Sequence, residues 1–128
     1  MEKNNLVYNL VKYGYSFQEY EDKVIISTDS KLRINVNFSN EKIKIKSELI
    51  GWNFLSGIMD IKFENAVKYA MITTFICIFA LMVVKSMWGN LLPILLFTCV
   101  IIWTASSVSY YNVKIENMKT RIYFWMKN

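Results

Sequence analysis

Histidine is absent from this chain of 128 residues, and proline, glycine and cysteine are scarce, at one, four and two residues. Without histidine, the Ser-His and Cys-His nucleophile pairs and all histidine-based metal sites are excluded. The scarcity of proline and glycine, beside an aromatic content of 16%, excludes collagen-like, disordered and low-complexity chains. The sequence contains no enzyme motif. We therefore predict a non-enzymatic protein with no catalytic residues, no metal site and no cofactor.

Charged residues are also missing from two long stretches. The first, residues 69–88, has Lys85 as its one charge, and a lysine so near the end of a helix can extend its ammonium group to a membrane surface. The second, residues 91–111, has no charge. An apolar helix of about 20 residues spans the hydrocarbon core of a bilayer. We predict a transmembrane hairpin. The alternative is a buried hairpin of a soluble protein, for which the preceding residues offer too little apolar surface.

The cations near these two stretches are distributed unevenly. Six lie on the side of the two chain ends within about 20 residues of the spans, whereas the turn of the hairpin holds only Lys85. Most of the net charge of +5 comes from residues 112–128, which carry four cations and one anion. The positive-inside rule therefore predicts a multi-pass protein of the cell inner membrane with both termini in the cytoplasm. The six cations are Lys62, Lys68, Lys114, Lys119, Arg121 and Lys127.

Residues 1–57 have the pattern of a small cytosolic unit. An apolar stripe predicts a short helix over residues 2–13, and apolar residues then recur with a period of two, which is typical of strands. We predict an α+β fold in which the N-terminal helix covers the apolar face of a four-stranded antiparallel β-meander. The predicted strands are residues 15–20, 23–28, 32–38 and 42–46.

Two further segments lie beside the predicted spans. Residues 58–68 are a juxtamembrane connector that forms either a short strand or the first turns of a helix. The aromatic residues Trp52, Phe54 and Phe63 are predicted to lie at the membrane interface and to couple the cytosolic unit to the spans. Residues 112–128 have the apolar stripe of an amphipathic helix, which either continues the second span or lies on the anionic leaflet.

The polar face of the last two predicted strands is basic. Arg33, Lys42, Lys44 and Lys46 alternate with apolar residues and are predicted to project from one face. Like charges on one face repel each other unless an anion compensates them. The candidate ligands are a nucleotide or oligonucleotide, or the headgroups of membrane lipid. The alternative is that these cations only protect a sheet edge and keep it soluble.

Small and hydroxylic residues recur along both predicted spans. Ala70, Thr73 and Cys77 form a seam on the first span, and Ser106 and Ser109 lie on the second. Such seams favour helix packing, and in a homo-oligomer they can line a pore. The alternative is that the hydroxyls bond carbonyls of their own helix. The absence of charge in the middle of either span argues against a proton relay or a voltage sensor.

In organisation, a small cytosolic unit with a basic strand and a two-span hairpin with small-residue seams resembles the small membrane effectors of bacterial nucleotide-signalled antiphage defence. This resemblance to an antiviral effector implies an oligomeric pore that a nucleotide ligand opens. We therefore expect an oligomeric, channel-like membrane effector whose cytosolic unit senses an anionic ligand. The alternative is an accessory or immunity-type subunit that packs against a larger membrane protein.

Overall fold

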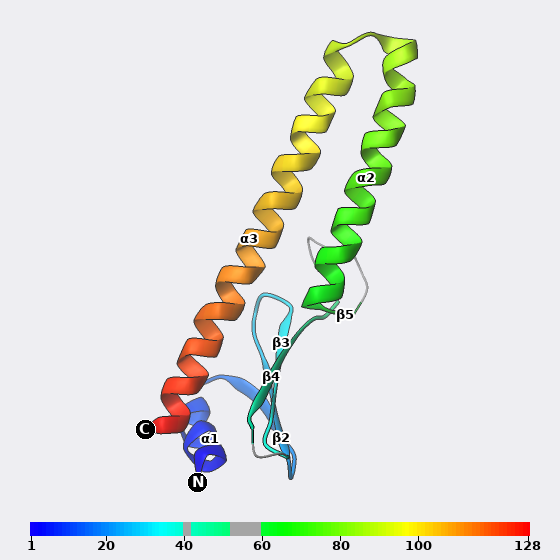
Figure 1. Cartoon of the computed structure of the whole chain (residues 1–128). Coiled ribbons are helices and arrows are strands. Elements are labelled where there is room, and N and C mark those ends of the chain that lie inside the picture. Colours follow the sequence, from blue (N-terminus) through cyan, green and yellow to red (C-terminus); the bar gives the residue numbers. More distant parts are fainter. Residues whose placement is uncertain (40–41, 52–59) are drawn as a thin grey trace.

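The computed structural model describes residues 1–39, 42–51 and 60–128. A small sheet and a short helix lie at one end of the molecule, and two long antiparallel helices extend from it (Figure 1). The α+β class is confirmed. In chain order the elements are α1 (Glu2–Lys12), β1 (Ser16–Glu19), β2 (Lys23–Ser27), β3 (Leu32–Asn37), β4 (Lys44–Leu49), β5 (Ile61–Lys62), α2 (Phe63–Trp88) and α3 (Leu91–Lys127).

The sheet is an antiparallel meander of five strands in the order β1-β2-β3-β4-β5. The prediction of four strands is corrected by β5, in which Ile61 and Lys62 pair with Leu49 and Glu48 of β4. Two residues are too few to show an alternating pattern, so the sequence could not decide whether the connector, residues 58–68, forms a short strand or the start of a helix. The structure shows both, because α2 begins at Phe63, directly after β5.

One face of the sheet forms the core. Six apolar side chains on this face are at most 1% exposed, and they belong to one cluster with side chains of α1 and of the C-terminal half of α3. The N-terminal helix was predicted to cover the apolar face of the sheet, and it covers only part of it. α1 contributes the buried side chains of Leu6 and Leu10, and α3 contributes more of the buried side chains that pack on this face. The six sheet residues are Val24, Ile26, Leu32, Ile34, Val36 and Leu49.

α1 and α3 contact each other beside the sheet. The ring of Tyr13, which follows α1, stacks on Trp125 of α3 with 5.3 Å between the ring centroids. The side-chain amide of Asn9 donates a hydrogen bond to the carbonyl oxygen of Trp125 at 3.4 Å. These contacts join the first and last helices of the chain.

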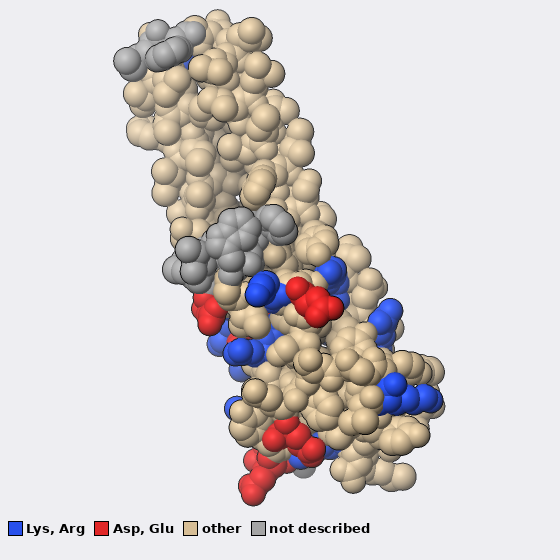
Figure 2. All heavy atoms as spheres, turned by 180° about the vertical axis from the view of Figure 1, so that it is seen from behind, with Lys and Arg blue, Asp and Glu red and all other residues tan. Residues whose placement is uncertain are grey.

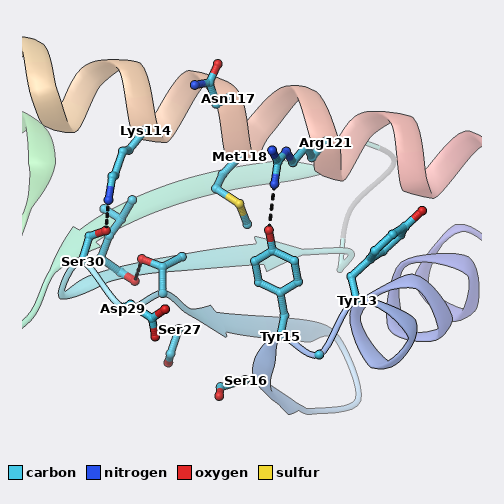
Figure 3. A pocket seen from close by; sticks show the side chains of 13 residues that line it. Tyr13, Tyr15, Ser16, Ser27, Asp29, Ser30, Lys114, Asn117, Met118 and Arg121 are labelled. Carbon is cyan, nitrogen blue, oxygen red and sulfur yellow. Dashed lines mark hydrogen bonds between the residues drawn. The ribbon is translucent and has the colours of Figure 1, made fainter.

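α1 ends at a glycine in the left-handed region of backbone space. Gly14 has a φ of 70°, which a residue without a Cβ adopts without strain. The backbone N–H groups of Gly14 and Tyr15 donate to the carbonyl oxygens of Val11 and Leu10 at 3.1 and 3.0 Å. This pair of bonds is typical of a Schellman C-terminus. The turn leads Tyr15 into β1, next to α3 (Figure 3).

α3 is one continuous helix of 37 residues. The sequence predicted a span over residues 91–111 and an amphipathic helical tail over residues 112–128 that either continues this span or lies on the anionic leaflet. Of the two alternatives for the tail, the structure shows the continuation of the second helix. The apolar stripe of the tail is buried against the sheet because it recurs on one face of the helix. Within the tail the stripe consists of Ile115, Met118, Ile122 and Trp125, and the buried Tyr111 continues it toward the span.

α2 and α3 are long and apolar enough to cross a membrane, by length and composition. In each helix, only 6% of the most apolar window is buried inside the described structure. Phe75, Phe79 and Leu91, for example, are 72–74% exposed. Figure 2 shows the charged side chains gathered around the sheet end, whereas the helix pair is almost free of them on the face in view. The described chain therefore does not provide the cover that a buried soluble hairpin needs.

Candidate anion-binding surfaces

The face of the sheet opposite the core is basic. Because side chains alternate along a strand, the residues between the buried ones on β2, β3 and β4 point to this outer face. The register places Lys23 opposite Asn37, and Asn37 opposite Lys44. In the next row, Asn35 is opposite Lys46. We call the five cations of this surface the basic face: Lys23, Arg33, Lys44, Lys46 and Lys62.

Three of the four predicted ligand-binding residues lie on the basic face. Arg33, Lys44 and Lys46 come together there, whereas Lys42 is exposed and precedes β4. Lys62 was predicted only as a cation beside the membrane, because the pairing of β5 with β4 was not visible in the sequence. Lys23, Lys44, Lys46 and Lys62 line a hollow of about 300 Å³ together with Asn35, Asn37 and Glu48.

The positive charge of this face is poorly compensated. Within the described residues, the two ion pairs closer than 4.0 Å are Lys3–Glu19 and Lys119–Glu116, and neither contains a member of the basic face. Glu48 is the one acid in the hollow. The Oδ1 atom of Asn35 is buried and has no hydrogen-bond partner in the described structure. Buried polar atoms usually have a partner, so this oxygen is an unused acceptor on the basic face.

A larger cavity lies between α3 and the sheet unit (Figure 3). We call it the α3 cleft; its volume is about 500 Å³. Lys114, Met118 and Arg121 line it from α3, where they recur at i, i+4 and i+7 and so share one helix face. Residues at the start of β1, at the C-terminal end of β2 and in the turn after β2 line the opposite side. They are Tyr15, Ser16, Ser27, Thr28, Asp29 and Ser30.

Two hydrogen bonds cross the α3 cleft. The ammonium group of Lys114 donates to the hydroxyl of Ser30, and a guanidinium nitrogen of Arg121 donates to the hydroxyl of Tyr15 at 2.9 Å. Both partners are neutral, and Asp29 is the one acid among the lining residues. The sequence used Lys114 and Arg121 only as topology signals, because their partners are 84 and 106 residues away along the chain.

The predicted seam of the first long helix faces α3. Ala70 is buried, and Ala70, Thr73 and Cys77 line a cavity of about 350 Å³ between α2 and α3. Ser106 and Ser109 of α3 are exposed and do not line this cavity. The hydroxyls that do meet between the helices belong to Thr74 and Thr104, whose Oγ1 atoms are 3.1 Å apart. This contact was missed because helical spacing alone does not show how two helices are rotated against each other.

The threonine hydroxyls also bond their own helices. Thr73 and Thr74 donate to the carbonyl oxygens of Tyr69 and Ala70 at 2.9 and 2.8 Å. Thr104 donates to Val100 in the same way, at 3.0 Å. These threonines therefore follow the alternative prediction, in which the hydroxyls donate hydrogen bonds to carbonyl oxygens of their own helix.

Of the three predicted coupling residues, only Phe63 can be placed. Phe63 is the first residue of α2, is partly buried and packs against the core cluster. Trp52 and Phe54 lie outside the described residues.

No protein-family model matches this chain, and no curated protein or solved structure matches it either.

Proposed function

We propose that this protein is a non-enzymatic membrane effector. In this proposal α2 and α3 cross the cell inner membrane as a hairpin with both termini in the cytoplasm, and the sheet unit binds an anionic ligand on the basic face. The uncovered apolar surface of both long helices supports the membrane assignment. The excess of cations at the sheet end, against Lys85 alone in the hairpin turn, supports the orientation.

The observation that carries the proposal is the direct connection between the basic face and α2. Lys62 belongs to the basic face and is also the N-cap of α2. No loop separates the two, since β5 ends at Lys62 and α2 begins at Phe63. An anion that binds Lys46 and Lys62 therefore acts on the first turn of α2.

The chemistry of the basic face favours a ligand with several phosphate groups. Five cations with one neighbouring acid attract a multivalent anion better than a single carboxylate. Asn35 and Asn37 add amide groups that can bond the edge of a base. Tyr20, which is 48% exposed and lies under the ammonium group of Lys23 at 4.8 Å, offers a ring on which a base can stack. A nucleotide or an oligonucleotide has all three features.

Forming a pore in the membrane, which is the proposed effector function, requires more than one copy of the chain. Two helices cannot enclose a polar path, so a pore requires a homo-oligomer. Ser106 and Ser109 are exposed on α3, which leaves their hydroxyls available to a neighbouring copy.

The decisive test combines oligomeric state with ligand binding. The full chain is purified in a mild detergent, its mass is measured by light scattering, and its affinity for a fluorescent oligonucleotide and for nucleoside triphosphates is measured at two salt concentrations. We expect an oligomer that binds in a salt-dependent way. Binding should be lost in Lys44→Glu/Lys46→Glu/Lys62→Glu and kept in Lys12→Glu/Lys127→Glu, which alters cations away from the basic face. A monomer, or equal binding by both variants, contradicts the proposal.

The orientation is tested separately with Ser86→Cys, which places a thiol in the last turns of α2. In intact cells a membrane-impermeant maleimide should label this cysteine from outside, and the wild-type chain, whose cysteines lie inside the proposed spans, serves as the control. Labelling only after the cells are lysed would place the hairpin turn in the cytoplasm.

The second candidate function is an accessory subunit. It is favoured by the same exposed apolar surface of α2 and α3, which a larger membrane protein can cover. In that case the native protein should co-purify with this partner in stoichiometric amount, and the lysine reversals on the basic face should have no effect.

A further inference from the structure

The α3 cleft begins just beyond the point at which α3 is predicted to leave the membrane. Tyr111 is the last residue of the second predicted span, residues 91–111, and it is also the first buried residue of the stripe that packs on the sheet. At about 1.5 Å per residue, Lys114 lies about 5 Å beyond Tyr111 along the helix axis, and Arg121 about 15 Å beyond it. The headgroup layers of a bilayer are about 5–8 Å thick on each side of the hydrocarbon core. Lys114 therefore lies at the level of lipid phosphates when α3 spans a membrane.

The ammonium group of Lys114 is held in the cleft by uncharged groups. It lies 4.7 Å from the centroid of the Tyr110 ring and donates to the hydroxyl of Ser30. Arg121 points into the same cleft, toward the hydroxyl of Tyr15 (Figure 3). Neither cation takes part in an ion pair among the described residues. The cleft thus holds two positive charges against one acid, Asp29, and an anion can compensate the cations without breaking an existing ion pair.

We propose that the α3 cleft is a second binding site, specific for a phosphate-bearing group, and that an anionic phospholipid supplies this group. Lys114 and Ser30 bind the phosphate at headgroup level. Arg121 and Tyr15 line the other end of the same cleft, and the guanidinium group of Arg121 adds a second positive charge to the attraction of the phosphate. The volume of about 500 Å³ and the opening beside α3 suit a headgroup of this kind.

A ligand in this cleft has a mechanical consequence that differs from that of the basic face. Tyr15 precedes β1 and Ser30 lies between β2 and β3, so the headgroup joins the sheet unit to α3. The basic face, in contrast, connects to α2 through β5. Lipid binding therefore adds to the packing that already holds the sheet unit on α3, and it leaves the first turn of α2 free to respond to the other ligand.

The proposal rests on the membrane assignment and is independent of the ligand of the basic face. Its test is the melting temperature of the full chain in mild detergent, measured with added phosphatidylglycerol, with phosphatidylcholine and with inorganic phosphate. We expect phosphatidylglycerol to raise the melting temperature in a concentration-dependent way. A rise with phosphatidylglycerol alone assigns the site to a lipid, whereas an equal rise with inorganic phosphate assigns it to a soluble phosphate compound and contradicts the lipid source.

Variants separate the cleft from general charge effects. Lys114→Gln/Arg121→Gln should reduce the apparent affinity for phosphatidylglycerol more than tenfold, and Lys12→Gln/Lys127→Gln, with the same loss of charge elsewhere, should not. Where the cleft double variant does not fold, Tyr15→Phe and Ser30→Ala keep both cations, and each should weaken binding about three- to tenfold. No rise with either phosphate source, or the same rise in the cleft variants as in the control, overturns the proposal.

Discussion

The two halves of α3 contain similar apolar residues in opposite surroundings. In the first half, Ile102 and Trp103 are 59% and 58% exposed. In the second half, Ile115 and Ile122 are 2% and 0% exposed, although the helix runs through both halves without a break. The difference lies in the pattern rather than in the kind of residue. The first half is uncharged on all sides, whereas the second has an apolar stripe with charged residues beside it.

This comparison indicates that one helix serves two environments, the proposed bilayer and the core of the sheet unit. Because no loop separates the two halves, the sheet unit cannot turn independently of the second proposed span. α2 is different, since it begins directly after β5, and among the described residues the members of α2 in or against the core cluster are Phe63, Ala66 and Ala70, near its start. Four substitution experiments, taken from the largest expected effect to the smallest, test whether the two halves of α3 and the helix pair behave in this way.

The largest effect is expected in the buried half. Ile122→Ala removes a fully buried side chain and should lower the free energy of unfolding by about 2–5 kcal/mol. Ile102→Ala, in the exposed half, should change it by less than about 0.5 kcal/mol. Chemical denaturation in mild detergent, followed by near-UV circular dichroism, measures both. Equal effects of the two substitutions would remove the distinction between the halves.

When the substitution introduces a charge, the larger effect is expected in the exposed half of α3. Ile102→Lys places an ammonium group near the centre of the second proposed span and should cost about 2.5–3.5 kcal/mol in membrane insertion. Val113→Lys puts the same charge on an exposed position of the second half and should have little effect. The readout is the fraction of protein that stays in the membrane after alkaline carbonate extraction. Full retention of Ile102→Lys would argue that the first half does not lie in lipid.

The cleft that joins the second half to the sheet unit should respond moderately. Tyr15→Phe removes the acceptor of the Arg121 hydrogen bond, and without added lipid it should cost about 1 kcal/mol of unfolding free energy. Tyr123→Phe is the matched control, since this tyrosine is 49% exposed on α3 and does not line the cleft. The same denaturation assay applies, and a larger loss from the control would show that the cross-cleft bond adds nothing.

The smallest effect is expected between the long helices. Thr74→Val removes the contact with Thr104 and should cost about 0.6 kcal/mol, the average for such bonds within membranes. Thr98→Val is the control, because Thr98 bonds only Ile94 of its own helix in the described structure. A double-mutant cycle with Thr104→Val isolates the pair. A coupling energy of zero would mean that the hydroxyls only satisfy their own helices.

Most elements of this fold could be predicted from local patterns. The alternation of Leu32, Ile34 and Val36 predicted β3 and its buried face, and the stripe through Ile115 and Ile122 predicted the helical end of the chain. The missed strand, β5, is too short to have a pattern, and it exists because its backbone pairs with β4. Hydrophobic patterns depend on neighbouring residues, whereas the pairing of a strand depends on which distant segment of the chain lies beside it.

The candidate sites also contain some residues that the sequence places together and others that only the fold brings together. Lys44 and Lys46 were predicted on one face because they belong to a single strand. Lys62 joined them only through the pairing of β5, and the α3 cleft brings Arg121 next to Tyr15 across 106 residues. Spacing along the chain contains no signal for either contact.

The sequence by itself determined the chemistry of each surface: two uncharged stretches, one basic strand face, one amphipathic end, and no histidine for catalysis. Only the tertiary structure decided which surfaces meet. It made the second uncharged stretch and the amphipathic end one helix, gave α3 the larger share of the sheet cover, and turned Ser106 and Ser109 outward. The physical reason is that periodicity specifies which face of an element is apolar, whereas the partner of that face depends on the packing of the whole chain.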